Sequence, residues 1–197
     1  IRGTHKAGTI MSISTYSSLP IAETAKSAPG APFLFQIYMS KDSAYNEFIV
    51  KRARDAGAKA IIITIDAGTA GNLESDVRNN YSYSAETPNV TEFYEGSNVT
   101  QSQARAMRKV GFSGEDIASI KRVGGLPVLV KGIQSPEAAE LAIAAGAAGI
   151  WVSNHGGRQL DRAPASPDTP PSLADVVHQL LPICFACGAP AGTPVCH

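Results

Sequence analysis

Short, uninterrupted runs of apolar residues recur along this sequence and alternate with stretches of helical character. Runs such as Ile61–Ile63 and Val128–Val130 are continuous rather than alternating, which is typical of strands buried on both faces of a parallel sheet. The repeated order of strand, loop, helix and strand predicts an α/β protein, either a barrel or a doubly wound sheet. Strands are expected at Gly8–Ser14, Phe33–Met39, Ala60–Ile65, Pro127–Val130, Gly149–Ser153 and Pro182–Phe185.

Helix start and stop signals stand between these runs. Ser135 can cap a helix that has Pro136 in its first turn, and Gly146 can close it. A Ser-Gly-Glu-Asp run at residues 113–116 resembles a capping box. Helices are therefore expected from Asp42 to Ala56, from Ser113 to about Val123, from Ser135 to Gly146 and from Thr169 to about Leu181.

One long segment, Asp66 to Phe112, breaks this rhythm. It is polar and weakly periodic, and it follows directly after a predicted strand. Loops of this length inside a compact domain are usually functional lids or disordered. Because α/β enzymes build their sites at the carboxyl ends of strands, we interpret residues 66–112 as an active-site lid, with disorder as the alternative.

Composition excludes several classes of partner. The 17 basic and 17 acidic side chains give zero formal net charge, which predicts no attraction to nucleic acid or to an anionic membrane surface. The apolar runs are shorter than the roughly 20 residues that a membrane span needs. No signal-peptide pattern is present at the start, so a cytoplasmic location is expected.

The three cysteines lie in the last stretch of the chain. Cys184 and Cys187 with Cys196 and His197 could be interpreted as four zinc ligands. Adjacent Cys and His are poorly placed to chelate one ion, and an odd number of cysteines without a spread framework is typical of reduced thiols. No metal site is therefore predicted.

The strongest local feature is the string Ser-Asn-His-Gly-Gly-Arg-Gln at residues 153–159, directly after a predicted strand. Imidazole is the usual general base near neutral pH, and guanidinium is the best bidentate binder of carboxylates. The two glycines allow the backbone to approach a flat ligand closely. An isolated His-x-x-Arg pair would more often be a solvated loop, but the full string is far more specific.

This string resembles the signature of the FMN-dependent 2-hydroxy-acid dehydrogenase and oxidase family. Other segments read like that family in the same order, namely Gly8–Ser14, Phe35–Asp42, Ala58–Asp66 and Leu126–Gln134. The resemblance implies a TIM (β/α)8 barrel, present here over residues 1–197 without its first strand, its last strand and an N-terminal segment. Tyrosine at position 16 and the Phe-Gln-Ile-Tyr-Met run at 35–39 are most similar to the L-lactate oxidase branch.

The resemblance also implies roles for individual residues. His155 would be the catalytic base, Asp66 the carboxylate that stabilises the protonated imidazole, and Arg158 the clamp for the substrate carboxylate. Tyr16 and Tyr38 would contact the substrate. The positions that would bind FMN are Ser14, Gln36, Thr64 and Lys131.

Three positions depart from the family pattern. Leu73 follows Gly71-Asn72, where the family has a second carboxylate-binding arginine. The predicted lid has no clear counterpart of the tyrosine that the lactate oxidases carry in theirs, and the corresponding position falls near Arg105. The family's Asp-x-Gly-x-Arg phosphate-binding run should follow Phe185, but the chain has Ala186 and Pro190 in the places of the acid and the arginine.

The function implied is oxidation of L-lactate, or a similar small 2-hydroxy acid, to the 2-oxo acid, with FMN as cofactor and O2 reduced to hydrogen peroxide. A dehydrogenase with another electron acceptor is one alternative. An inactive barrel fragment, with at most weak flavin binding, is another and is favoured by Leu73, Ala186 and Pro190. The resemblance further implies a homotetramer.

Overall fold

The computed structural model describes residues 1–68, 71–82, 85–168, 173 and 183–185. The chain divides into two compact units. The first contains Ile1–Ile63, Ser84–Lys109 and Ser119–Pro127, and the second contains Thr64–Tyr83, Val110–Ala118 and Val128–His197.

The first unit is built on three parallel strands: β1 (Met11–Ser14), β2 (Phe33–Ile37) and β3 (Ile61–Thr64), whose last residue opens the second unit. Strand β2 pairs with both neighbours, so that Phe35 lies opposite Ile13 on one side and opposite Ile61 on the other. The side chains of the apolar run at 61–63 are fully buried. The continuous apolar pattern therefore does mark strands covered on both faces.

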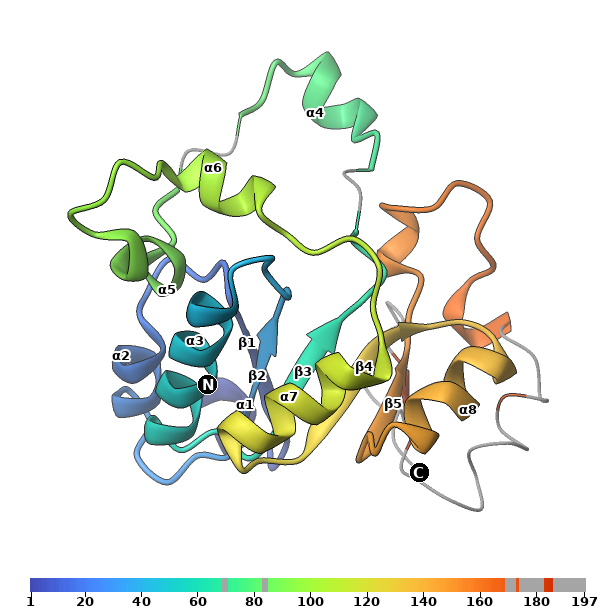
Figure 1. Cartoon of the computed structure of the whole chain (residues 1–197), viewed down its shortest axis with the longest axis horizontal. Helices are drawn as coiled ribbons and strands as arrows, with labels where there is room; N and C mark the ends of the chain where they lie inside the picture. Colours follow the sequence, from blue (N-terminus) through green and yellow to red (C-terminus); the bar gives the residue numbers. More distant parts are fainter. Residues whose placement is uncertain (69–70, 83–84, 169–172, 174–182, 186–197) are drawn as a thin grey trace. The chain divides into compact units, whose positions relative to one another are not determined.

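Helices α1 (Arg2–Lys6), α2 (Ile21–Lys26) and α3 (Ser43–Asp55) belong to this unit, and Figure 1 shows α2 and α3 side by side. The carboxylate of Asp42 caps α3 by accepting hydrogen bonds from the backbone of Ala44 and Tyr45. Gly57, with φ of +92°, follows the end of the helix.

The predicted lid segment carries several short helices. These are α4 (Glu74–Arg78) in the second unit, and α5 (Pro88–Thr91), the 3₁₀ helix η1 (Glu92–Tyr94) and α6 (Gln101–Ala106) in the first. The rings of Phe93 and Tyr94 pack on Tyr45 of α3, with centroid distances of 5.6 and 5.8 Å. Disorder is therefore the wrong interpretation for Pro88–Tyr94, and the lid role of the segment stays a prediction.

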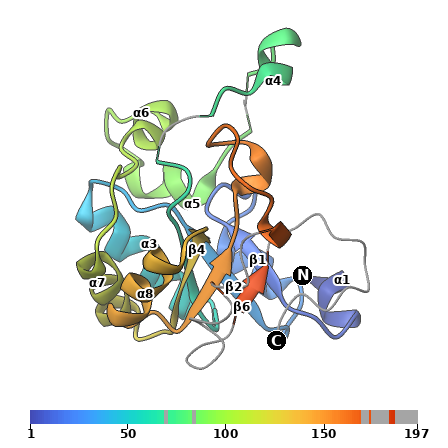
Figure 2. The same cartoon turned by 90° about the vertical axis from the view of Figure 1, so that its right-hand side faces the viewer.

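The second unit holds three further parallel strands, β4 (Val128–Ile133), β5 (Gly149–Val152) and β6 (Ile183–Phe185). Helix α7 (Gly114–Gly124) begins in this unit. Helix α8 (Pro136–Ala144) packs beside β4 and β5 (Figure 2), and the Ser135 hydroxyl caps it by accepting from Ala138. Two 3₁₀ turns, η2 (His155–Gly157) and η3 (Ser166–Asp168), follow β5.

Some predicted bounds were wrong. Strand β4 continues three residues beyond Val130, with a register shift between Lys131 and Ile133, so Lys131 lies within the strand rather than at its end. Strand β1 begins at Met11 instead of Gly8. The expected helix from Thr169 to Leu181 lies outside the described residues apart from Leu173.

Candidate active site

Three predicted site residues of the second unit lie in contact with one another. The backbone N–H of Ile65 donates to the carbonyl of Lys131 at 2.9 Å, which brings the next residue, Asp66, beside β4. Oδ1 of Asp66 is 2.7 Å from Nδ1 of His155, and Oδ2 is 3.6 Å from Nζ of Lys131. The Lys131 ammonium is also 3.3 Å from the same imidazole nitrogen.

This trio of Asp66, Lys131 and His155 is largely withdrawn from water. The side chains are 9, 18 and 20% exposed, respectively. Burial lowers the pKa of Lys131, and the neighbouring Asp66 carboxylate opposes that effect. With Nδ1 of His155 occupied by the carboxylate, Nε2 is the ring nitrogen left to exchange a proton with a bound molecule.

The backbone around His155 has an unusual conformation. His155 itself has φ of +60°, and the two following glycines have φ of +67° and +69°. A left-handed conformation at a residue with a side chain costs about 1–3 kcal/mol and is concentrated at functional sites. Hydrogen bonds hold the turn, because the backbone of His155 donates to the Ser153 hydroxyl and Asn154 accepts from Gly157. The two glycines are thus required for the turn that positions His155.

Two other glycines permit close approaches of the chain. A Cβ atom at Gly132, where φ is +109°, would lie 2.7–2.8 Å from atoms of Asp66. A Cβ atom at Gly71 would lie 1.9 Å from the carbonyl oxygen of Arg158. Both positions therefore exclude any larger residue unless the backbone moves, and the first of them bears directly on the trio.

Arg158 is not brought into contact with the trio. Its side chain is exposed and makes no hydrogen bond or ion pair with the residues that the structure describes. Thr64 is buried at the end of β3 and is followed by Ile65 and Asp66.

The remaining predicted residues form a cluster in the first unit. Ser14 and Gln36 are register partners on β1 and β2, and the Ser14 hydroxyl donates to the Gln36 side-chain oxygen at 3.2 Å. Just beyond the strand ends, the rings of Tyr16 and Tyr38 stack with their centroids 5.2 Å apart. The structure therefore brings these four predicted residues together in two adjacent pairs.

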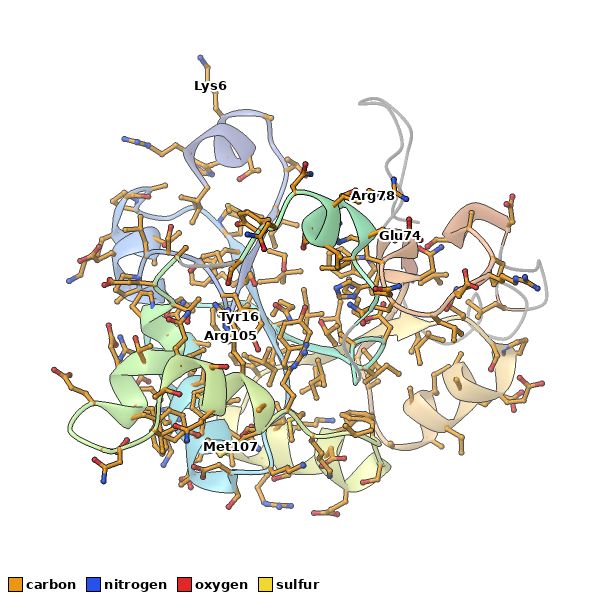
Figure 3. All side chains as sticks on the ribbon, turned by 90° about the horizontal axis from the view of Figure 1, so that it is seen from above. Lys6, Tyr16, Glu74, Arg78, Arg105 and Met107 are labelled. Atoms are coloured by element: carbon orange, nitrogen blue, oxygen red, sulfur yellow. The ribbon has the colours of Figure 1, made fainter. Side chains whose placement is uncertain are left out.

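Two arginines accompany these tyrosines, and sequence reasoning gave neither of them a role. The Arg105 guanidinium lies 5.0 Å from the ring centroid of Tyr16, and Figure 3 shows the two side chains next to each other. The Arg108 guanidinium lies 5.4 Å from the ring of Tyr38. Burial raises the pKa of the Tyr16 phenol, and the positive charges of both arginines oppose this. The spacing of two arginines three residues apart near the end of a helix was the available signal.

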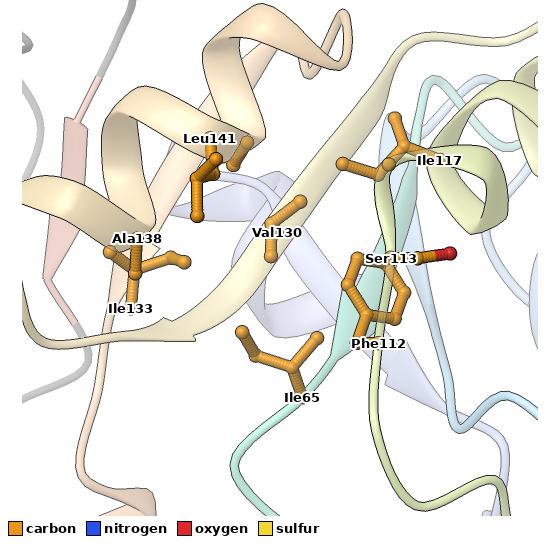
Figure 4. A pocket seen from close by; sticks show the side chains of 10 residues that line it. Ile65, Phe112, Ser113, Ile117, Val130, Ile133, Ala138 and Leu141 are labelled. Atoms are coloured by element: carbon orange, nitrogen blue, oxygen red, sulfur yellow. The ribbon is translucent and has the colours of Figure 1, made fainter.

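The second unit also contains an apolar cavity of about 400 Å³ between α7, α8 and β4 (Figure 4). Its lining is mainly aliphatic, with Phe112 and Leu141 among the larger side chains, and it includes no ionisable group. This cavity therefore offers no acid–base chemistry.

Among the described residues, no cluster of histidine, cysteine and acidic side chains could hold a metal ion. The described helices include none with the length and apolar character that crossing a membrane requires. The cysteines considered as zinc ligands lie outside the described residues, except Cys184 in β6.

Acid–base side chains at the carboxyl ends of parallel strands are the arrangement found in α/β enzymes. The chain belongs to the FMN-dependent dehydrogenase family, whose model matches residues 1–197. It is 44% identical over 198 residues to an L-lactate oxidase from Lentilactobacillus hilgardii and 36% identical over 204 residues to glycolate oxidase 3 from Arabidopsis thaliana. Each alignment covers 98% of this chain but only 53% and 55% of the relative, so the chain spans about half the length of the curated relatives it matches.

Solved structures of 2-hydroxy-acid oxidases are also similar to this chain. A refolded lactate oxidase from Pediococcus acidilactici superimposes with a TM-score of 0.88 at 45% identity, over 95% of this chain and 50% of that one. A mandelate oxidase variant with (S)-mandelic acid superimposes with a TM-score of 0.79 at 30% identity, over 95% and 51%. These neighbours are TIM-barrel flavoenzymes, so the chain has the fold of part of such a barrel and the doubly wound alternative is wrong.

FMN is the cofactor of this family, and a related mandelate oxidase structure contains an FMN adduct. Each unit offers polar groups of the kind that a flavin ring can bind. The first unit has the Ser14 hydroxyl and the Gln36 amide, and the second has the partly buried Lys131 ammonium. Residues 186–192, which replace the family's phosphate-binding run, lie outside the described residues.

Proposed function

We propose that this chain carries the site for oxidation of L-lactate, or a similar small 2-hydroxy acid, to the 2-oxo acid, with O2 reduced to hydrogen peroxide. The observation that carries the proposal is the 2.7 Å contact between Asp66 and His155 beside the partly buried Lys131. A base, a carboxylate that stabilises its protonated form and a nearby cation are the groups that removal of hydrogen from a CH–OH centre requires. The lactate oxidase relatives favour lactate as the substrate.

His155 would accept the proton of the substrate 2-hydroxyl at Nε2, because Nδ1 faces Asp66. The Asp66 carboxylate then stabilises the imidazolium and fixes the orientation of the ring. FMN, when bound, would supply the acceptor for the hydride equivalent, one hydrogen with two electrons, that leaves the substrate carbon. Lys131 would place its positive charge against the flavin ring, and Ser14, Gln36 and Thr64 would hydrogen-bond that ring.

The substrate would be held by its carboxylate and its hydroxyl. We assign Arg158 to the carboxylate because an exposed guanidinium beside the His155 turn can donate two parallel hydrogen bonds. The phenols of Tyr16 and Tyr38 would contact the substrate. Residues 66–112 would cover the bound substrate as a lid. We further propose a cytoplasmic location and, by family resemblance, a homotetramer.

The first test uses visible absorption. The purified chain, supplied with FMN, should retain a flavin spectrum after gel filtration, and L-lactate added without oxygen should bleach it. Admitting oxygen should restore the colour and produce hydrogen peroxide. A colourless protein that cannot be reconstituted would overturn the proposal in favour of an inactive fragment, whereas bleaching reversed by a dye but not by oxygen would indicate a dehydrogenase.

The second test concerns the base. His155→Gln should keep the flavin spectrum and lose turnover by roughly 10²–10⁴-fold, the usual contribution of general acid–base catalysis. The matched control is His5→Gln, because His5 is exposed in the short helix α1. Unchanged turnover in His155→Gln would contradict the assignment.

A further inference from the structure

Asn154 connects the turn at His155 to a later part of the loop that follows β5, within the second unit. Its backbone N–H donates to the Ser166 hydroxyl at 3.3 Å, and its side-chain amide donates to the carbonyl of Pro164 at 3.0 Å. Figure 1 shows the chain running on beyond β5 and then turning back on itself. Residues 164–166, which we call the return segment, are therefore the part of the loop that holds Asn154.

The side chain of Asn154 also reaches in the other direction, into the turn itself. Its oxygen accepts from the backbone N–H of Gly157 at 3.1 Å, across His155 and Gly156. One amide group is thus bonded to the turn through its oxygen and to the return segment through its nitrogen. Removing that side chain would release both contacts together.

The return segment is itself attached to β4. The Pro164 carbonyl accepts a second hydrogen bond, at 3.3 Å, from the side-chain amide of Gln134, which directly follows that strand. Ser166 is only 3% exposed, so its hydroxyl is withheld from water and its bond to the loop does not compete with solvent. Because Lys131 lies on β4, the strand that carries one member of the trio also holds the return segment.

The turn at His155 needs support of this kind. A residue with a side chain in the left-handed conformation, as His155 is, keeps that conformation only where the surrounding structure over-determines it. The bonds from His155 to Ser153 and from Gly157 to Asn154 join residues two and three positions apart, so they shape the turn locally. The bonds from Asn154 to the return segment span 10 and 12 positions and fix where the turn lies relative to β4.

We propose that Asn154 and Ser166 are positioning residues, which hold the imidazole of His155 against Asp66 while the base takes up and returns its proton. This inference rests on the proposed function, because it names residues that orient the base of that same reaction. It also gives a role to Asn154, a member of the string at 153–159 that neither proton transfer nor carboxylate binding explains.

Alanine variants and a conservative variant test the positioning. Ser166→Ala removes the acceptor of the Asn154 N–H, and Asn154→Ala removes both bonds of that side chain. Each should lower kcat for L-lactate by roughly tenfold to a hundredfold with a smaller change in KM, because a displaced base weakens the transition state more than substrate binding. Ser166→Thr keeps a hydroxyl and should recover most of the turnover.

The matched control is Ser113→Ala. Ser113 belongs to the same unit, and its hydroxyl donates to Asp116 at 3.1 Å at the start of α7, so this variant also loses one serine hydrogen bond. Its turnover should equal that of the wild type. Thermal unfolding of each variant separates a loss of folding from displacement of the base. Asn154 is only partly buried, so Asn154→Ala decides the question if Ser166→Ala fails to fold.

The proton between Nδ1 of His155 and Oδ1 of Asp66 gives a readout that does not depend on turnover. A proton in such a charge-assisted hydrogen bond is strongly deshielded in NMR spectra and exchanges slowly with water. His155→Gln assigns the signal, because it removes that imidazole. The signal should persist in Ser166→Thr and Ser113→Ala, and it should be lost or broadened in Ser166→Ala and Asn154→Ala.

The outcomes separate the two proposals. A signal that depends on Asn154 and Ser166 in a chain that does not oxidise lactate would support the inference and overturn the proposed function. Oxidation of lactate with signal and turnover unchanged in both alanine variants would overturn the inference alone, as would an equal loss of turnover in Ser113→Ala. A wild-type chain with neither the signal nor oxidation would overturn both.

Discussion

The imidazole Nδ1 of His155 lies 2.7 Å from the carboxylate Oδ1 of Asp66, although 89 positions separate the two residues in the sequence. Asp66 lies two residues beyond the end of β3 and His155 three residues beyond the end of β5, so both stand where parallel strands end. The contact gives the imidazole a fixed partner at one nitrogen and leaves the other to the substrate.

Replacing the carboxylate tests this relationship. Asp66→Asn keeps a side chain of the same shape but removes the negative charge that stabilises the imidazolium. We expect turnover to fall by roughly tenfold to 150-fold, which corresponds to about 1.5–3 kcal/mol for a hydrogen bond to a charged group. Steady-state kinetics with Asp55→Asn, an exposed acid at the end of α3, is the control. Equal turnover in both variants would contradict the pairing.

The close approach at Gly132 gives a second prediction. In Gly132→Ala the new methyl group would meet Asp66, and φ of +109° is unfavourable for alanine. We expect Asp66 to be displaced from His155 and turnover to fall by roughly a hundredfold, the effect of about 1 Å of misplacement. Gly30→Ala is the control, because Gly30 also has positive φ but meets no atom within 4 Å. Similar losses of activity in the two variants would point to backbone strain alone.

Replacement of the buried Asn89 should lower the stability of the fold. The Asn89 side chain accepts from the backbone of Ile21 and donates to the Ser17 hydroxyl, and it is fully buried. Asn89→Ala leaves the Ile21 N–H without that acceptor, which should lower the free energy of unfolding by about 1–3 kcal/mol. Denaturant unfolding measures this loss. Asn98→Ala, at an exposed position, should change the free energy of unfolding by less than about 0.5 kcal/mol.

The raised pKa of Tyr94 leads us to expect that the fold loses stability at alkaline pH. Burial, together with the Asp42 carboxylate that accepts its hydrogen bond at 3.2 Å, raises the pKa of Tyr94 to about 12, above the ordinary value of 10.0. The stabilisation is therefore complete below pH 10 and is lost as pH rises from 10 towards 12. Tyr94→Phe should show a shallower fall of the free energy of unfolding between pH 9 and 11, measured by denaturant titration. Tyr81→Phe, at an exposed position, should behave like wild type.

The sequence by itself determined the α/β class, the order and approximate positions of the strands, and the two glycines after His155. A strand with a continuous apolar run such as Ile61–Ile63 has to be buried on both faces. The string at residues 153–159 is specific enough to indicate the family. The sequence also predicted Asp66 and His155 as partners, and Tyr16 and Tyr38 as residues of one site. Local sequence pattern and family resemblance are enough to predict these features, because each depends on which residue type lies at a fixed distance from the end of a strand.

Only the tertiary structure decided what depends on contacts between distant segments. The extension of β4 through Ile133 depends on pairing with β5, which no local pattern encodes. The packing of Phe93 and Tyr94 on Tyr45 turned a segment with weak periodicity into ordered structure, because aromatic burial outweighs low helix propensity. The placement of Arg105 and Arg108 over the two tyrosines follows from backbone hydrogen bonds between residues 39–41 and 107–109, and such long-range pairing is visible only once the chain is folded.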